Sequence, residues 1–258
     1  MKISVITVNY NDQLGLERTI KSLQLQTAMN YEHIIIDGGS TDGSKEVIEH
    51  YQESFSYWVS ESDNGIYHAM NKGIEVAQGD YIIFMNSGDT FYQRESIELF
   101  NKNIGEEGFI YFNINLKKKE ESTIYKPDQK LSFSTLRYQM PFHQATFIRR
   151  ELFLKFGMYD ESLKIVADWK FFIIAIAKYN QSYKYVDEVM SDHYHDGISA
   201  DPANAPLIRE ERKKVLQEHF ECFLNEYEAM DQLQLKFKRI RNSRKIKWLI
   251  KLGLLNDF

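Results

Sequence analysis

Short apolar segments alternate with segments of helical periodicity in the first third of the chain. We expect strands where apolar and β-branched residues are concentrated, over 2–8, 31–37, 55–60 and 80–85. Between them, apolar residues recur with the period of an α-helix over 13–26, 45–52 and 66–77. Strands that alternate with helices in this way form mainly parallel sheets with right-handed crossovers. The sequence therefore predicts an α/β fold with a Rossmann-like sheet flanked by helices.

Polar residues follow these predicted strands near the point where each strand ends. They are Asn9, Tyr10, Asp37, Asp63 and Asp89. The carboxyl ends of parallel strands meet at one edge of a sheet, where open α/β folds bind nucleotides. One such residue alone would be an ordinary turn or capping residue. Their repetition predicts a nucleotide site at this edge.

Four motifs stand out in the same part of the chain. They are Ser4–Asn11 (SVITVNYN), Ile34–Gly43 (IIIDGGSTDG), Glu61–Gly73 (ESDNGIYHAMNKG) and Gly79–Asp89 (GDYIIFMNSGD). In this order and at this spacing, the motifs resemble those of glycosyltransferase family 2, closely over residues 1–100 and more loosely to about His195. Members of that family are inverting enzymes of GT-A fold that use nucleotide-sugar donors. The resemblance implies that fold and that activity.

The resemblance assigns nucleotide-sugar binding to residues of all four motifs. They are Thr7, Asn9, Tyr10, Asp37, Asp63, Asn71, Asn86 and Ser87. Asn9 and Tyr10 match a pair that lines the base pocket, and Asp37 matches the first of two acids that contact the base and the ribose. The second acid is replaced by Gly38, so we expect the base contact to fall to Asp37 and to backbone groups. A UDP-sugar is the expected donor.

Residues 86–89 occupy the region of the family's DxD motif. Carboxylates at a strand end can hold Mg²⁺ or Mn²⁺, and a divalent ion neutralises a diphosphate. Asp89 matches the metal-binding acid, whereas Asn86 and Gly88 depart from the motif. His195 matches a loop histidine that some members place near the metal, and it shares a strand face with His193. The expected cofactor is Mg²⁺ or Mn²⁺ on Asp89 and His195. A simple β-turn without a metal is the alternative for residues 86–89.

The second half of the chain is expected to shape the acceptor site. Asp168 matches the aspartate of a Glu-Asp pair at a helix start, and Ala167 replaces the glutamate. A helix N-terminus favours an ionised carboxylate, and the resemblance implies that Asp168 is the base that deprotonates the acceptor hydroxyl. His143, Gln144 and Trp169 are expected on the acceptor side. A capping role for Asp168 and a structural role for His143 are the alternatives.

The regular alternation of elements weakens after residue 89. Further strands are expected over 109–116, 122–125, 141–149, 183–186 and 189–194, and a buried helix over 168–179. Two helices are expected at the end, over 203–227 and 233–252. The predicted organisation is a GT-A domain over 1–200 and an α-helical extension over 201–258. Within the GT-A domain, 1–100 would bind the nucleotide sugar and 101–200 the acceptor.

The C-terminal segment is basic although the whole chain is acidic. The net charge of the chain is −5, yet residues 232–258 contain eight Lys or Arg and one acid and so carry +7. Apolar residues interleave with these cations over 232–254, as in an interfacial helix on anionic lipid. The acidic body and the lack of a recognised nucleic-acid module argue against a nucleic-acid partner. Packing on the body or on a protein partner is the alternative.

Cysteine content and hydropathy bear on the compartment. The single Cys222 allows no internal disulfide, which suits a reducing cytosol. No secretory signal is recognised, and the longest apolar run is too short to span a bilayer. We therefore expect a cytoplasmic protein whose basic tail contacts the cytoplasmic face of the inner membrane.

The sequence thus predicts metal-dependent transfer of a sugar from a nucleotide diphosphate sugar to a saccharide or lipid-linked acceptor in surface polysaccharide synthesis. A non-catalytic nucleotide-sugar-binding module is the alternative, because the DxD and Glu-Asp motifs are incomplete. A nucleotidyltransferase would need a glycine-rich basic loop after the first strand, and an NAD-binding oxidoreductase would need GxGxxG there. The segment Val8–Asp12 has neither.

Overall fold

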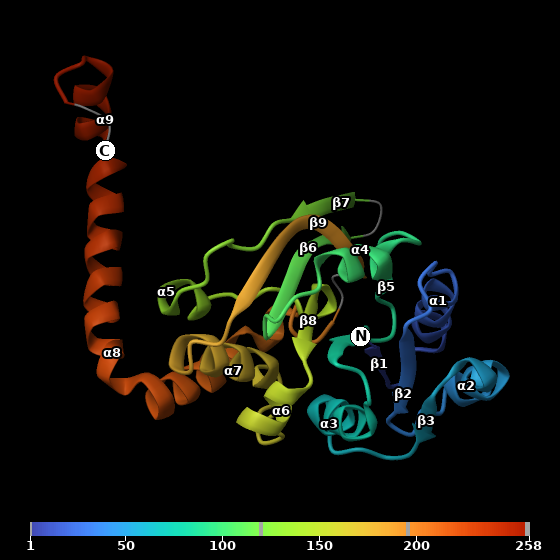
Figure 1. The fold of residues 1–258 in the computed structure, drawn as a ribbon. Helices are drawn as coiled ribbons and strands as arrows, with labels where there is room; N and C mark the ends of the chain where they lie inside the picture. Colours follow the sequence, from blue (N-terminus) through green and yellow to red (C-terminus); the bar gives the residue numbers. More distant parts are fainter. Residues whose placement is uncertain (1, 119–120, 195–196, 256–258) are drawn as a thin grey trace. The chain divides into compact units, whose positions relative to one another are not determined.

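The computed structural model describes residues 2–118, 121–194 and 197–255 (Figure 1). Its internal contacts divide the chain into two compact units, Met1–Arg212 and Lys213–Phe258. Among the described residues, every strand belongs to the first unit, and the second unit is helical.

Parallel strands form the N-terminal half of the sheet (Figure 1). In the spatial order β3-β2-β1-β4, they comprise β1 (Ile3–Asn9), β2 (Tyr31–Asp37), β3 (Tyr57–Ser60) and β4 (Tyr81–Phe84). The connecting helices are α1 (Gln13–Gln24), α2 (Ser44–Tyr51) and α3 (Ile66–Val76). The predicted alternation of strands and helices is confirmed. The register pairs Asp37 with both Asn9 and Ser60, so the polar strand ends meet at one edge.

Helices cover both faces of these parallel strands. On one face, Leu16 of α1 packs with Ile35 of β2 and Ile48 of α2. Helix α3 lies close against the opposite face, where a β-carbon on Gly73 would be only 2.5 Å from Cγ2 of Ile6. Strands covered on both faces read as continuous apolar runs, which explains why the sequence identifies them so clearly.

The second half of the sheet is mixed. Its strands are β5 (Thr90–Phe91), β6 (Phe109–Lys118), β7 (Glu121–Tyr125), β8 (Thr146–Arg149) and β9 (Tyr183–Tyr194). The order continues as β4-β8-β6-β9-β5, with β7 beside β6. Strand β8 is antiparallel to β4 and β6, whereas β9 is parallel to β6. The helices are α4 (Ser96–Asn103), α5 (Phe133–Leu136), α6 (Glu151–Phe156) and α7 (Ala167–Ile173), which continues as a π-helix over Ile174–Lys178.

Strand β9 differs from its prediction. It is one continuous strand, not two strands over 183–186 and 189–194. Phe112 of β6 pairs with Val186, whereas the next residue of β6, Asn113, pairs with Val189. The pairing of the two strands then continues. The polar residues between these valines are accommodated in a bulge, which interrupts the apolar pattern without ending the strand.

The C-terminal helices also differ from their predicted bounds. Helix α8 spans Ala205–Arg241, with non-helical backbone angles at Phe220, and α9 spans Arg244–Lys251. The predicted gap between 227 and 233 lies inside α8 because it contains neither Gly nor Pro. The break falls instead at Ser243, whose hydroxyl accepts the N–H of Ile246 and caps α9.

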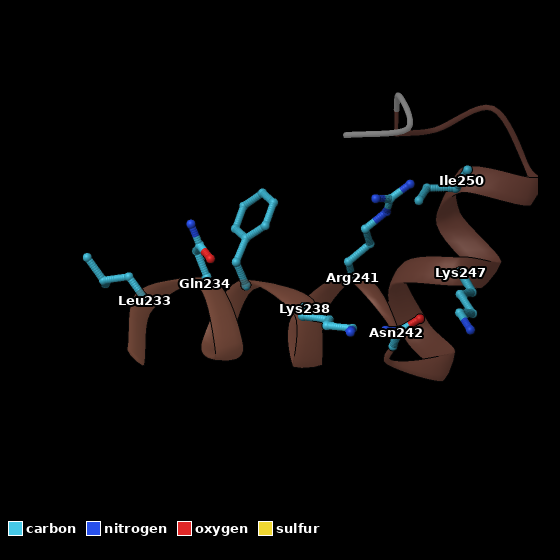
Figure 2. A pocket seen from close by; sticks show the side chains of 8 residues that line it. Leu233, Gln234, Lys238, Arg241, Asn242, Lys247 and Ile250 are labelled. Atoms are coloured by element: carbon cyan, nitrogen blue, oxygen red, sulfur yellow. The ribbon is translucent and has the colours of Figure 1, made fainter. Parts of the chain in front are cut away.

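The helical second unit exposes apolar and basic side chains together. Large apolar side chains more than half exposed in this unit are Leu233, Leu235, Phe237, Ile240, Trp248, Leu252 and Leu254. A groove at the junction of α8 and α9 is lined by Leu233, Ile250, Lys238, Arg241 and Lys247, among others (Figure 2). Within the described residues, no helix is both long enough and apolar enough to cross a membrane.

Candidate active site

A buried hydrogen-bond network joins the ends of β1, β2 and β3. The Asp37 carboxylate is fully buried. Its Oδ1 accepts from Asn9 Nδ2 at 2.6 Å and from Ser40 Oγ, and its Oδ2 accepts from Ser60 Oγ at 2.6 Å. Burial acts to raise the pKa of Asp37, but hydrogen bonds from Ser40, Ser60 and Asn9 outweigh it and lower the pKa. Asp37 is therefore ionised and holds the three strand ends together.

A cleft of about 840 Å³ opens at this edge of the sheet. The predicted donor residues that line it are Tyr10, Asp63, Asn86 and Ser87. The predicted metal, base and acceptor residues that line it are Asp89, Asp168, His143 and Gln144. The fold thus brings side chains from both halves of the predicted GT-A domain to one cavity, of a size that suits a nucleotide-like ligand.

Other predicted site residues lie away from the cleft wall. Thr7 is buried, and its Oγ1 lies 3.0 Å from Nε2 of His33. The Asn71 amide bonds to the backbone of Tyr159, donating to its C=O at 2.9 Å and accepting its N–H at 3.0 Å. These contacts stabilise the fold around the cleft. His195 lies outside the described residues.

The carboxylate of Asp63 lies against Gly38. A β-carbon on Gly38 would be 2.6 Å from Asp63 Oδ2 and 3.2 Å from Cδ2 of Tyr10. The other carboxylate oxygen, Oδ1, accepts the N–H of Gly65 at 2.8 Å and fixes the turn before α3. A carboxylate from a different loop therefore lies beside the position where the sequence lacks the family's second acid.

The segment Asn86–Asp89 forms a tight turn after β4. The backbone N–H of Asp89 donates to the C=O of Asn86 at 3.0 Å, and Gly88 has a φ of 95°, which favours glycine. The Ser87 hydroxyl donates to Oδ1 of Asn9 at 2.7 Å. This bond joins the turn to the network around Asp37.

Asp89 and His193 meet at the cleft. Asp89 is only 4% exposed, and its Oδ1 lies 2.7 Å from Nδ1 of His193 on β9. The sequence did not single out His193 as a site residue, although its alternation with His195 was an available signal. The pairing of β5 with β9 brings the two residues together, because Thr90 lies opposite Asp192.

The side chains at Asp89 fit a divalent ion that is bound together with a nucleotide. In the part of the chain that the structure describes, no group of three or more His, Cys, Asp or Glu side chains is placed to hold a metal. However, Mg²⁺ in nucleotide sites is usually bound through one or two carboxylates, with phosphate oxygens and water in the other positions. The Asp89 carboxylate at the cleft wall meets that requirement.

Asp168 lies in the first turn of α7 and accepts several hydrogen bonds. Its Oδ1 lies 2.9 Å from Tyr67 Oη and accepts the Trp169 N–H at 2.8 Å, and its Oδ2 lies 3.1 Å from His143 Nδ1. Burial acts to raise the pKa of Asp168, but the bonds from His143, Tyr67 and the Trp169 backbone outweigh it and lower the pKa. The Trp169 side chain is buried, and its indole donates to Leu136.

His143 connects the second half of the predicted GT-A domain to the turn after β4. It lies in a short 3-10 turn before β8, not inside the predicted strand. Its Nε2 lies 3.4 Å from Nδ2 of Asn86. The next residue, Gln144, places its amide nitrogen 3.1 Å from Nδ1 of His193. These contacts join segments far apart in sequence, so no local pattern could indicate them.

Arg18, Lys164 and Tyr67 also line the cleft, although the sequence did not single them out. The Arg18 guanidinium lies 4.4 Å from the centroid of the Tyr194 ring, which holds it at the wall. In the sequence, Arg18 is one polar position of an amphipathic helix, so its helical spacing does not separate it from solvent-facing residues. Cations at the cleft suit a ligand that carries phosphate groups.

The chain has a GT-A fold, as two solved structures show. S. aureus TarS, residues 1–349 in complex with UDP-GlcNAc, aligns with a TM-score of 0.63 at 18% identity, over 76% of this chain and 59% of that chain. The mannosyltransferase PcManGT from Pyrobaculum calidifontis, in complex with GDP-Man and Mn²⁺, aligns with a TM-score of 0.58 at 14% identity. That alignment covers 97% of this chain and 83% of the other.

Sequence comparison places the chain in a family. The profile of Glycosyl transferase family 2 matches residues 4–163. An uncharacterised glycosyltransferase of Mycobacterium tuberculosis is 33% identical over 187 residues, covering 67% of this chain and 68% of the relative. A PGL/p-HBAD biosynthesis glycosyltransferase of Mycobacterium bovis is 25% identical over 201 residues, covering 75% and 77%. The chain belongs to glycosyltransferase family 2.

Proposed function

We propose that this protein transfers a sugar, with inversion, from a UDP-sugar to a hydroxyl of a saccharide or lipid-linked acceptor in the synthesis of a surface polysaccharide. The observation that carries the proposal is the cleft shared by Asp63, Asp89 and Asp168. Family membership supplies the reaction class. The UDP-GlcNAc and GDP-Man complexes of the two structural relatives support a nucleotide sugar as donor.

The donor would lie along the edge formed by the parallel strands. Tyr10 and Asp63 flank Gly38, which lines the cleft, and are placed to contact the base and the ribose. Asp37 would support this wall without touching the ligand. Both of its carboxylate oxygens accept hydrogen bonds within the protein, and one of these bonds holds Asn9 in place. Because Asp63 would supply the carboxylate that contacts the ligand, β2 needs only one acid, Asp37.

The diphosphate would lie near Asp89. A divalent ion on this carboxylate would stabilise the charge that develops on the leaving diphosphate. His193 holds the Asp89 side chain by the contact between Nδ1 and Oδ1. Arg18 and Lys164 add positive charge at the cleft wall.

The acceptor would enter from the side of α7. Asp168 and the side chains in contact with it would form the group that removes the acceptor proton. Once its proton is removed, the acceptor oxygen attacks the anomeric carbon from the face opposite the diphosphate, and the configuration inverts. Fixed hydrogen bonds around Asp168 keep this centre oriented without reorganisation during the reaction.

The second unit would bring the enzyme to the cytoplasmic face of an anionic membrane. Its exposed apolar side chains would enter the interface, while the cations that interleave with them would meet lipid head groups. Each such cation contributes about 1 kcal/mol near an anionic surface. This placement suits an acceptor that is itself attached to lipid.

A thermal-shift panel tests the donor and the metal together. The purified chain is heated with UDP-, GDP- and dTDP-sugars, each with and without Mn²⁺ or Mg²⁺. A ligand that binds only the folded state stabilises it by about 2.7 kcal/mol at 100 times its Kd. We expect UDP-sugars to raise the Tm, and the metal to increase that rise. No rise with any nucleotide sugar would contradict the proposal, and binding without release of nucleoside diphosphate would favour a non-catalytic module.

A further inference from the structure

We infer that the acceptor proton is taken by Nε2 of His143, and that Asp168 is the positioning residue that orients and stabilises the imidazole. The inference rests on the proposed transfer reaction and assigns the atom that serves as its base. Family resemblance alone implies a different atom, a carboxylate oxygen of Asp168. The contacts around the two side chains distinguish these possibilities.

The Asp168 carboxylate is already engaged by donors of its own protein. Its Oδ1 faces both the Tyr67 hydroxyl and the Trp169 N–H, and its Oδ2 faces Nδ1 of His143. The side chain is 18% exposed. The Tyr67 hydroxyl carries one hydrogen, and the C=O of Ile165 lies closer to it, at 2.6 Å. A carboxylate that accepts from the Trp169 N–H and from Nδ1 of His143 is a weaker proton acceptor than a free one.

The imidazole of His143 presents the opposite situation. Because Nδ1 faces a carboxylate, this nitrogen carries the hydrogen, and Nε2 is left with a lone pair. The partner that the structure gives Nε2 is Nδ2 of Asn86, at 3.4 Å. This contact is long, so an acceptor hydroxyl can replace it. His143 lines the cleft, and its side chain is 18% exposed.

The groups around Asp168 favour its ionised form, which is the form that can orient the imidazole. Tyr67 on α3 bonds to Asp168, and burial followed by the charge of Asp168 raises its pKa well above the ordinary value, so it stays neutral. Tyr159 is also buried near Asp168 and has a raised pKa for the same reasons. Arg212 adds a positive charge on the side of Asp168. Protonation of His143 would convert a neutral ring beside a carboxylate into an ion pair.

The proposed step balances as follows. The acceptor O–H bond breaks and its proton moves to Nε2 of His143. The oxygen lone pair forms the bond to the anomeric carbon, and the electron pair of the bond to the diphosphate leaves with the nucleoside diphosphate. The imidazolium formed is paired with Asp168 and then releases its proton to solvent.

The substitution His143→Asn separates the two bases. Asparagine keeps an N–H near the position of Nδ1, so Asp168 retains a donor, but it has no nitrogen at the Nε2 position. The matched control is His50→Asn, the same change at an exposed histidine of α2. The readout is nucleoside diphosphate release from UDP-glucose, UDP-galactose, UDP-N-acetylglucosamine and GDP-mannose, with water and octyl glycosides as acceptors.

We expect His143→Asn to lower kcat at least 100-fold, in the range of a lost general base, while the donor KM and the donor-induced thermal shift are retained. A variant within threefold of the wild type would leave the proton with Asp168 and overturn the inference. Failure of the wild type with every donor would overturn the proposed function itself.

Discussion

The carboxylate of Asp63 fills the space into which a side chain on Gly38 would project. A β-carbon at residue 38 would lie 2.6 Å from Oδ2 of Asp63, closer than side-chain atoms approach without moving. The missing acid at position 38 and the presence of Asp63 are therefore parts of one arrangement. In the proposed enzyme, Asp63 supplies the carboxylate of this wall.

Gly38→Ala should weaken nucleotide binding, because the new methyl group must displace the Asp63 carboxylate. We expect the Kd for UDP to rise about fivefold, equivalent to about 1 kcal/mol, in isothermal titration calorimetry. Gly105→Ala is a matched control, since its β-carbon would also meet a carboxylate, 2.3 Å from Oε2 of Glu107, at a glycine that does not line the cleft. Equal Kd values for Gly38→Ala and the wild type would remove Asp63 from the donor wall.

The buried His33 should make stability depend on pH. Burial lowers its pKa to about 3, whereas an unfolded histidine titrates near pH 6.5. Between these values the unfolded chain binds the additional proton, so the contribution of neutral His33 is complete above about pH 6.5 and decreases as the pH falls toward 3. Urea unfolding from pH 7.5 to pH 4 should show this loss, and His33→Gln should flatten it.

Thr7, the partner of His33, provides a second check on the same contact. Thr7→Val removes the hydrogen bond to Nε2 of His33 and should lower the free energy of unfolding by about 1 kcal/mol. Because Thr7 does not line the cleft, the Kd for UDP should stay unchanged. A large rise in that Kd at constant stability would return Thr7 to the donor site.

The basic tail should bind anionic vesicles. Replacing Lys245, Lys247 and Lys251 with Glu reverses three exposed charges of α9. With each cation contributing about 1 kcal/mol, sedimentation with phosphatidylserine vesicles should be lost. The control carries the same substitution at the exposed Lys45, Lys102 and Lys155 of the first unit and should still sediment. Unchanged sedimentation of the tail variant would indicate that α9 packs on protein.

Local patterns predicted the N-terminal half of the GT-A fold well. Strand β2 was predicted with the bounds that it has, and the turn after β4 was placed correctly. Each of these segments is either apolar and bounded by turn residues or amphipathic with a clear start. Such signals depend only on neighbours in the sequence.

Long-range pairing could not be predicted in the same way. The contact between Asp89 and His193 depends on the antiparallel pair β5–β9, and the contact between His143 and Asp168 joins a turn to a helix start. Neither pair has a local signature. The contact of Thr7 with His33 could not be predicted either, because the sequence of a strand does not show which side chain of the neighbouring strand each residue meets.

The most direct test of the central claim compares Asp168→Asn with the wild type in two assays on the same preparations. Nucleoside diphosphate release in the presence of donor and acceptor measures turnover, and the donor-induced rise in Tm measures binding. The structure predicts that the variant keeps the rise in Tm and loses at least 100-fold in turnover, because the base centre is disturbed while the donor wall is intact. Full turnover by Asp168→Asn would contradict the assignment of this cleft as the site of sugar transfer.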